Sequence, residues 1–104
     1  MGSYRNRLDI IADILQVVSQ QAKKTQIMYQ ANLSYKVLQK YLKEVSDASL
    51  IEFECGEQCY RLTSKGSRFL AAYKKYSLGN RALEKRLNEI EDKKKVLEKL
   101  CSNQ

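Results

Sequence analysis

Few residue types in this chain of 104 residues are suited to covalent or acid–base chemistry. The chain has three cysteines, Cys55, Cys59 and Cys101, and no histidine. Without histidine it lacks the most common general base and the most common protein ligand of metal ions. It also shows no glycine-rich phosphate loop and no nucleophile with a recognisable base. The sequence therefore predicts no enzyme, no metal or cofactor site and no small-molecule substrate.

Two of the cysteines flank a predicted turn. Cys55 and Cys59 enclose three residues, Gly56-Glu57-Gln58, which are typical of a hairpin loop. If the two cysteines face each other as a non-hydrogen-bonded pair, a cross-strand disulfide is geometrically reasonable. The alternative is two free thiols, which is the usual state in the cytosol outside some hyperthermophiles. The sequence leaves both states open.

Basic side chains offer a second kind of chemistry, the binding of anions. The chain has 19 Lys and Arg against 12 Asp and Glu, which gives a formal net charge of +7. This excess favours a polyanionic partner, although an acidic membrane surface or solubility alone would also fit it. No apolar stretch approaches the ~20 residues of a transmembrane helix, so we expect no membrane partner.

Part of this charge lies on one face of a predicted helix, residues 35–47. The apolar stripe of that helix consists of Leu38, Tyr41, Leu42 and Val45. The opposite face carries Lys36, Gln39, Lys40 and Lys43. A basic face opposite an apolar stripe is typical of any solvated helix, so its meaning depends on the surrounding fold.

Hydrophobic periodicity predicts the elements around this helix. An amphipathic helix over residues 4–21 comes first, and Thr25 caps a short second helix over 26–31. A turn at Asn32-Leu33 leads to the helix at 35–47, which Ser34 caps. Alternating residues predict strands over 50–55 and 59–62, after which Thr63 caps a last helix.

This order of elements is that of a winged helix, a mostly helical α+β fold with a two-stranded wing. The second and third predicted helices form a helix-turn-helix, whose last helix enters the major groove of double-stranded DNA. We expect this DNA-binding domain to cover residues 4–76.

A heptad seam follows the domain. Its members are spaced alternately by four and three residues; they are Phe69, Tyr73, Tyr76, Asn80, Leu83, Leu87, Ile90, Lys94, Leu97 and Cys101. Gly79 costs about 1 kcal/mol relative to alanine and could end the helix, but the heptad phase continues across it and favours one helix. A helix of this length cannot bury its seam on so small a domain. We therefore expect residues 77–104 to form a coiled coil with a second copy of the chain.

Three stretches of the sequence resemble a known family. KTQIMYQANLSY at residues 24–35, LQKYL at 38–42 and YRLTSKGSRFL at 60–70 are similar to the archaeal ten-kilodalton "ten-a" type of DNA-binding protein. The resemblance implies a homodimer joined by an antiparallel coiled coil of the last helices. It also implies a chromatin-associated protein or a transcription regulator, located in the cytoplasm on the nucleoid. A parallel coil would instead bring the two copies of Cys101 together.

The resemblance further implies roles for individual residues. The basic face of the third helix would face the groove, where Gln39 can read an adenine edge and the lysines serve phosphates or guanine. The start of the second helix would lie at a phosphate. The predicted DNA-binding residues are Lys23, Lys24, Thr25, Ser34, Tyr35, Lys36, Gln39, Lys40, Lys43 and Arg61. The predicted dimer interface consists of Phe69, Tyr73, Tyr76, Leu83, Leu87, Ile90, Leu97 and Cys101.

The predicted wing departs from the pattern of many winged helices, which carry basic residues at the tip. Here the tip contains Glu54 and Glu57, and Arg61 is the only basic residue of the hairpin. Carboxylates repel phosphates, so the sequence puts a minor-groove role of the wing in doubt. The acidic tip also supports an alternative function, a protein–protein interaction module that uses the winged helix and the coil without binding DNA.

Overall fold

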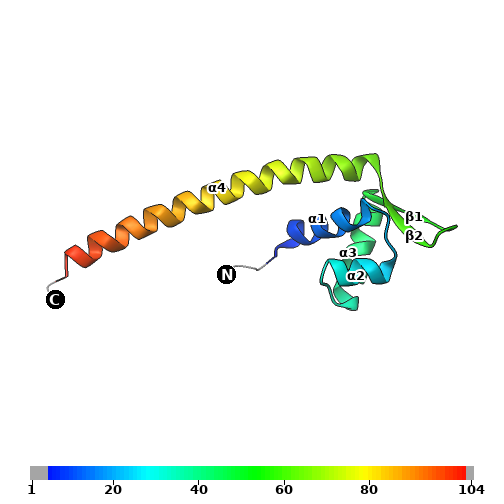
Figure 1. Ribbon diagram of the computed structural model, residues 1–104, viewed down its shortest axis with the longest axis horizontal. Helices are drawn as coiled ribbons and strands as arrows, with labels where there is room; N and C mark the ends of the chain where they lie inside the picture. The colour runs from blue at the N-terminus through cyan, green and yellow to red at the C-terminus, as the bar shows by residue number, and fades with distance from the viewer. Residues whose placement is uncertain (1–4, 103–104) are drawn as a thin grey trace. The chain divides into compact units, whose positions relative to one another are not determined.

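The computed structural model describes residues 5–102 of the chain. Its elements are α1 (Arg7–Val18), α2 (Lys24–Gln30), α3 (Tyr35–Asp47), β1 (Ile51–Glu54), β2 (Cys59–Leu62) and α4 (Ser64–Leu100) (Figure 1). This order confirms the mostly helical winged-helix fold. The chain divides into two compact units, of which the first ends at Tyr73 and the second begins at Lys74.

The first unit is built around a core that all three short helices share. Its largest fully buried side chains are Ile14, Leu15, Val18, Ile27, Leu38 and Val45. Ile14, Leu15 and Val18 lie on one face of α1, Ile27 is the buried residue of α2, and Leu38 and Val45 lie two turns apart on one face of α3. Burying a side chain of this size stabilises the fold by about 1.5–3 kcal/mol. The core therefore fixes how α2 and α3 lie against each other.

Capping side chains set the starts of two helices. α1 begins at Arg7, later than predicted, because Asn6 and Asp9 form a capping box. In that box the Asn6 side chain accepts a hydrogen bond from the Asp9 amide at 2.9 Å, and the Asp9 carboxylate accepts one from the Asn6 amide at 3.1 Å. Ser34 caps α3 as predicted, since its hydroxyl accepts a hydrogen bond from the Val37 amide at 3.3 Å.

The cap predicted for α2 is wrong. The helix begins at Lys24 with Lys23 at its N-cap, and Thr25 lies inside the first turn. A bridge between Ala22 and Tyr60 explains the shift: the Ala22 amide donates to the Tyr60 carbonyl at 3.2 Å, and the Tyr60 amide donates to the Ala22 carbonyl at 2.8 Å. These bonds keep Ala22 extended beside β2, so the chain turns into the helix directly after Lys23.

The turn between α2 and α3 has the left-handed residue that the sequence predicts. Asn32 has a φ of 54°, a value that asparagine tolerates better than most residues. The Arg5 guanidinium stabilises this turn by donating to the Ala31 carbonyl at 2.7 Å and to the Asn32 carbonyl at 2.9 Å. Asp13 holds the guanidinium through an ion pair of 2.8 Å. This contact links the start of α1 to the helix-turn-helix.

The wing has a longer loop than predicted. β1 and β2 pair antiparallel with Ile51 opposite Leu62 and Glu54 opposite Cys59, so Cys55 belongs to the loop. The Gln58 side-chain amide donates to the Cys55 carbonyl at 3.2 Å, and Gln58 itself has a φ of 56°. Cys55 and Cys59 are therefore not opposite each other, and of the two states that the sequence leaves open the structure has free thiols.

The wing connects to α4 through a close approach at Gly66. A Cβ atom there would lie 2.2 Å from the Leu50 carbonyl oxygen and 2.6 Å from a methyl carbon of Leu62. The Gly66 amide donates to the Thr63 hydroxyl at 3.0 Å, which confirms Thr63 as the cap of the last helix. Only glycine lets the first turn of α4 pack this closely on the strands.

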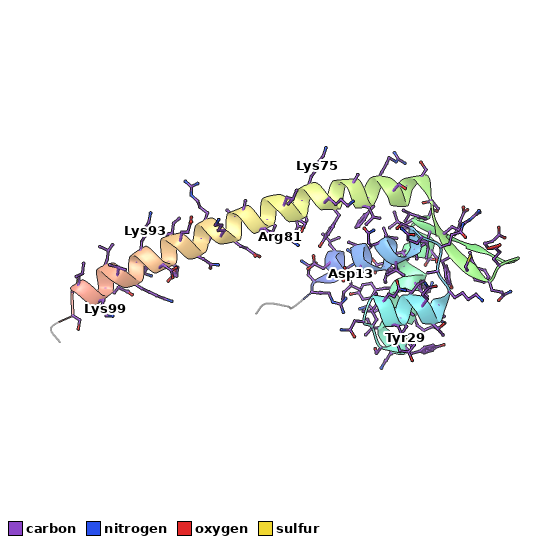
Figure 2. The ribbon with its side chains drawn as sticks, in the orientation of Figure 1. Asp13, Tyr29, Lys75, Arg81, Lys93 and Lys99 are labelled. Carbon is purple, nitrogen blue, oxygen red and sulfur yellow. The ribbon has the colours of Figure 1, made fainter. Side chains whose placement is uncertain are left out.

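In the second unit the chain continues as α4. The helix passes Gly79 without interruption, as the heptad phase predicts. Leu83, Leu87, Ile90 and Leu97 of the seam are each more than half exposed. Lysine and arginine side chains such as Lys75, Arg81, Lys93 and Lys99 also project from this helix (Figure 2). No helix within residues 5–102 combines the length and the apolar character needed to cross a membrane.

Candidate nucleic-acid interface

The exposed face of α3 carries the polar residues that the sequence assigns to it. Lys36, Gln39, Lys40 and Lys43 are all exposed. Leu38, Tyr41, Leu42 and Val45 on the other side are buried in the core. Core packing thus holds α3 in place while four long polar side chains extend into solvent.

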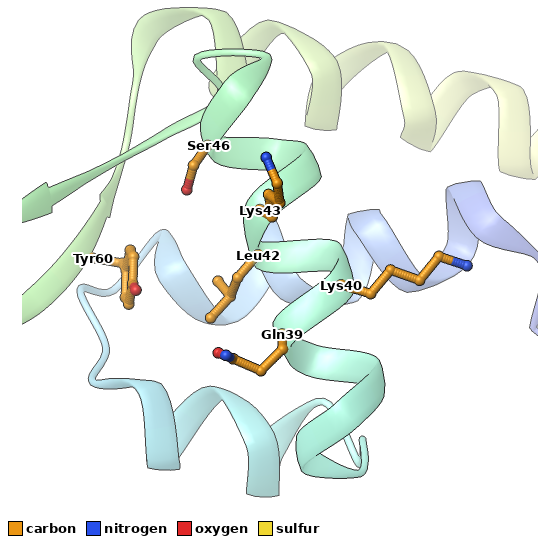
Figure 3. Close-up of a pocket in the computed structure, with 6 residues that line it drawn as sticks. All are labelled: Gln39, Lys40, Leu42, Lys43, Ser46 and Tyr60. Carbon is orange, nitrogen blue, oxygen red and sulfur yellow. The ribbon is translucent and has the colours of Figure 1, made fainter.

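An open depression lies beside this face. It has a volume of ≈ 480 Å³ and is lined by Gln39, Lys40, Leu42, Lys43, Ser46 and Tyr60. Figure 3 shows Gln39 and Ser46 on the side of α3 that faces Tyr60, whereas Lys40 points away from it. Polar groups of α3 and an aromatic ring of the wing therefore border one hollow.

Tyr60 belongs to this surface, although the sequence pattern did not predict it. A hairpin register with Cys55 opposite Cys59 places Glu54 opposite Tyr60, whereas the structure places Phe53 there. The error of one residue hides the aromatic pair, because neighbouring residues of a strand point to opposite faces. The alternation of apolar Ile51 and Phe53 with two glutamates was the signal that could have revealed it.

Two lysines of α3 make different interactions within the protein. Lys43 forms an ion pair of 3.1 Å with Asp47, and both side chains are more than two-thirds exposed. The Lys40 ammonium lies 5.3 Å from the centre of the Tyr41 ring. Exposed ion pairs contribute about 0–1 kcal/mol. A phosphate can therefore replace Asp47 as the partner of Lys43 at little cost.

The structure brings Lys24 of α2 next to Tyr35 of α3. The Lys24 ammonium lies 3.5 Å from the Tyr35 hydroxyl and 4.7 Å from the centre of its ring. Tyr35 is 54% exposed, so its ring remains accessible beside the lysine. Lys24 and Tyr35, which the sequence predicts as DNA-binding residues of two separate helices, thus lie in contact on the surface.

The other predicted residues at these helix starts are placed differently. Lys23 and Thr25 are exposed, but α2 has only seven residues and no side-chain cap. The Ser34 hydroxyl already accepts a hydrogen bond from the backbone of α3.

Arg61 lies apart from the α3 surface. Its guanidinium is 3.3 Å from a Glu52 carboxylate oxygen and 4.0 Å from one of Glu54. Tyr60 and Arg61 are consecutive in β2, so their side chains leave opposite faces of the hairpin. The structure therefore joins Arg61 to the wing's own carboxylates and does not bring it together with Gln39 or Lys43.

Comparisons with known proteins agree with this architecture. A family model described as winged helix-turn-helix matches residues 4–81. The structure is similar to that of Sso10a-2, a DNA-binding protein from Sulfolobus solfataricus, with a TM-score of 0.63 and 26% identity over 95% of this chain and 100% of that chain. A search of curated protein sequences gave no match.

Two structures of ZitR from Lactococcus lactis share the fold at lower identity. The wild type, solved in complex with DNA, has a TM-score of 0.56 and 14% identity over 94% of this chain and 73% of that chain. A point mutant of ZitR has a TM-score of 0.57 and 14% identity over 96% of this chain and 75% of that chain. The match to Sso10a-2 across nearly all of both chains confirms the resemblance to the archaeal "ten-a" proteins. Since the family model covers most of the chain, including the helix-turn-helix and the wing, this protein belongs to the winged helix-turn-helix family.

Proposed function

We propose that the chain binds double-stranded DNA as a homodimer and acts as a transcription regulator or chromatin-associated protein. The observation that carries this proposal is the exposed face of α3, the second helix of the helix-turn-helix. It presents three lysines and a glutamine to solvent in a chain of net charge +7. Sso10a-2, which shares the fold and 26% of the sequence, is itself a DNA-binding protein.

In this proposal the lysines and the glutamine of α3 have different roles in DNA recognition. Lysines neutralise phosphates or donate to guanine, and these contacts supply most of the sequence-independent affinity. Gln39 can both donate and accept, so it suits an adenine edge in the major groove. The Lys24 and Tyr35 pair at the start of α3 adds a phosphate or sugar contact at one end of the helix.

Dimerisation through α4 is the second part of the proposal. The exposed fractions of Leu83, Leu87, Ile90 and Leu97 lie between 55% and 63%. Covering apolar area stabilises association by roughly 25 cal/mol per Å², which favours a partner helix along this seam. The family resemblance favours antiparallel pairing of the two helices.

The direct test is fluorescence anisotropy with a duplex of random sequence and about 30 base pairs, titrated at several salt concentrations. We expect log affinity to fall linearly with log salt, by about 0.9 for each phosphate neutralised. A variant carrying K36A, K40A and K43A should bind more weakly with a shallower slope. Absence of binding at low salt, in a sample shown to be dimeric, would contradict the proposal.

One observation favours the alternative of a protein–protein interaction module. The wing tip presents Glu57 to solvent, and the only arginine of the hairpin pairs with Glu52 and Glu54. A hairpin with this charge is poorly suited to phosphates but suits a basic protein surface. A dimer that binds no duplex would make this alternative the better account of the fold.

A further inference from the structure

The wing has two chemically different faces. Ile51 lies opposite Leu62 and Phe53 opposite Tyr60, and because side chains alternate along a strand these four uncharged residues share one face. The rings of Phe53 and Tyr60 pack with their centres 5.0 Å apart at an interplanar angle of 58°.

The charges of the strands lie on the other face. There the Arg61 guanidinium is held 3.3 Å from Glu52 and 4.0 Å from Glu54. One guanidinium against two carboxylates leaves a formal charge of −1 on this face, which points away from the aromatic pair. The acidic character of the hairpin therefore does not extend across its aromatic face.

The aromatic face is continuous with the exposed face of α3. Tyr60 lines the same depression as Gln39 and Lys43 (Figure 3). Phe53, which packs on Tyr60, is 47% exposed. The exposed part of a phenylalanine ring contributes favourable hydrophobic free energy only when a partner covers it. In a duplex held by the α3 lysines, base edges of the major groove would lie beside this face, and phenylalanine makes apolar contact with thymine methyl groups there.

We propose that the wing contacts duplex DNA through Phe53 and Tyr60, as an uncharged aromatic surface in place of a basic tip. This inference rests on the proposed DNA-binding function and assigns two further residues to it. The contact adds affinity without neutralising a phosphate. It therefore contributes equally at low and high salt, whereas the lysine contacts weaken as salt rises.

The test compares substitutions in the intact chain by anisotropy across a salt series. F53A should weaken binding by about tenfold at every salt concentration, because apolar area is no longer covered, and leave the slope of log affinity against log salt unchanged. F53Y keeps the ring and should bind within about twofold of the wild type. K40A should reduce the slope by about 0.9, because it removes a phosphate contact. L78A, at an exposed leucine of α4 outside the seam, is the control for loss of surface apolar area, and circular dichroism checks that each variant is folded.

The outcomes separate this inference from the function on which it rests. If the wild type fails to bind duplex at low salt, the proposed function is wrong and the aromatic contact with it. If the wild type binds and folded F53A binds equally well, only the aromatic contact is wrong. A slope that falls in F53A would also overturn it, because the loss would then come from a charged contact.

Discussion

At the scale of single residues, neighbouring side chains of α3 have different expected roles. Lys36 is exposed at the start of the helix and Gln39 borders the depression beside Tyr60. A lysine that meets a phosphate adds affinity without regard to sequence, whereas a glutamine that meets a base edge adds preference for one base pair. The two kinds of contact are separable by experiment because only the first changes the release of counterions.

We expect K36A to weaken binding to all duplexes alike and to reduce the salt slope by about 0.9. Q39A should keep the slope and lose about 1–3 kcal/mol of discrimination at one position of a preferred site. Selection of binding sequences from a random pool, followed by anisotropy on the selected and scrambled duplexes, measures both. If K36A changed the base preference, or if Q39A left it unchanged, the roles assigned to Lys36 and Gln39 would be wrong.

At the scale of elements, periodicity and composition predict the helices and strands well, because each depends on residues close in sequence. α3 and β2 begin and end at the predicted residues, and α4 continues past Gly79. One error lies where a distant segment decides the structure, and the other lies in the conformation of a short loop. The bridge from Ala22 to Tyr60 moves the start of α2. The hairpin register differs by one residue from the predicted one because Cys55 belongs to the loop, where Gln58 has a φ of 56°.

For the candidate interface too, the sequence predicts the features that depend on one element and misses those that depend on two. The polar face of α3 could be predicted from its own spacing, because one helix carries all of its members. The depression could not, since it needs Tyr60 beside Gln39 and therefore the correct register of β2. The ion pairs that join Arg61 to Glu52 and Glu54 likewise depend on which strand residues share a face.

Two glycines of α4 provide a matched test of the element's packing. G66A should destabilise the fold by more than about 2 kcal/mol, because its Cβ would overlap the Leu50 carbonyl and the Leu62 side chain. G79A should stabilise the helix by about 1 kcal/mol, since a Cβ there meets nothing within 4 Å. Thermal unfolding followed by circular dichroism measures both. Equal effects of the two substitutions would contradict the close packing at Gly66.

At the scale of the whole molecule, the chain combines a small folded unit with a helix whose seam residues Leu83, Leu87, Ile90 and Leu97 are each more than half exposed. Leu87 lies on the seam and Leu78 lies off it, although both are more than half exposed. An exposed seam of this length predicts that the stability of the second unit depends on protein concentration.

A charge on the seam should therefore separate the proposed dimer. We expect L87K to shift the protein to monomer in analytical ultracentrifugation, because a buried lysine without a partner is strongly unfavourable. L78K adds the same charge to the same helix and should leave the dimer intact. Dissociation by both variants, or by neither, would show that the seam is not the interface.

The three thiols differ in exposure, so the chain can be labelled with fluorescent dyes at selected cysteines without adding new ones. Cys55 in the wing loop and Cys101 after α4 are exposed, whereas Cys59 is 6% exposed. Maleimide dyes should therefore modify the first two and spare the third in the folded protein. A C55S chain would carry one dye, at the end of the coil. Energy transfer between protomers would then be weak in an antiparallel pair and strong in a parallel one, so the thiols report the orientation of the assembly.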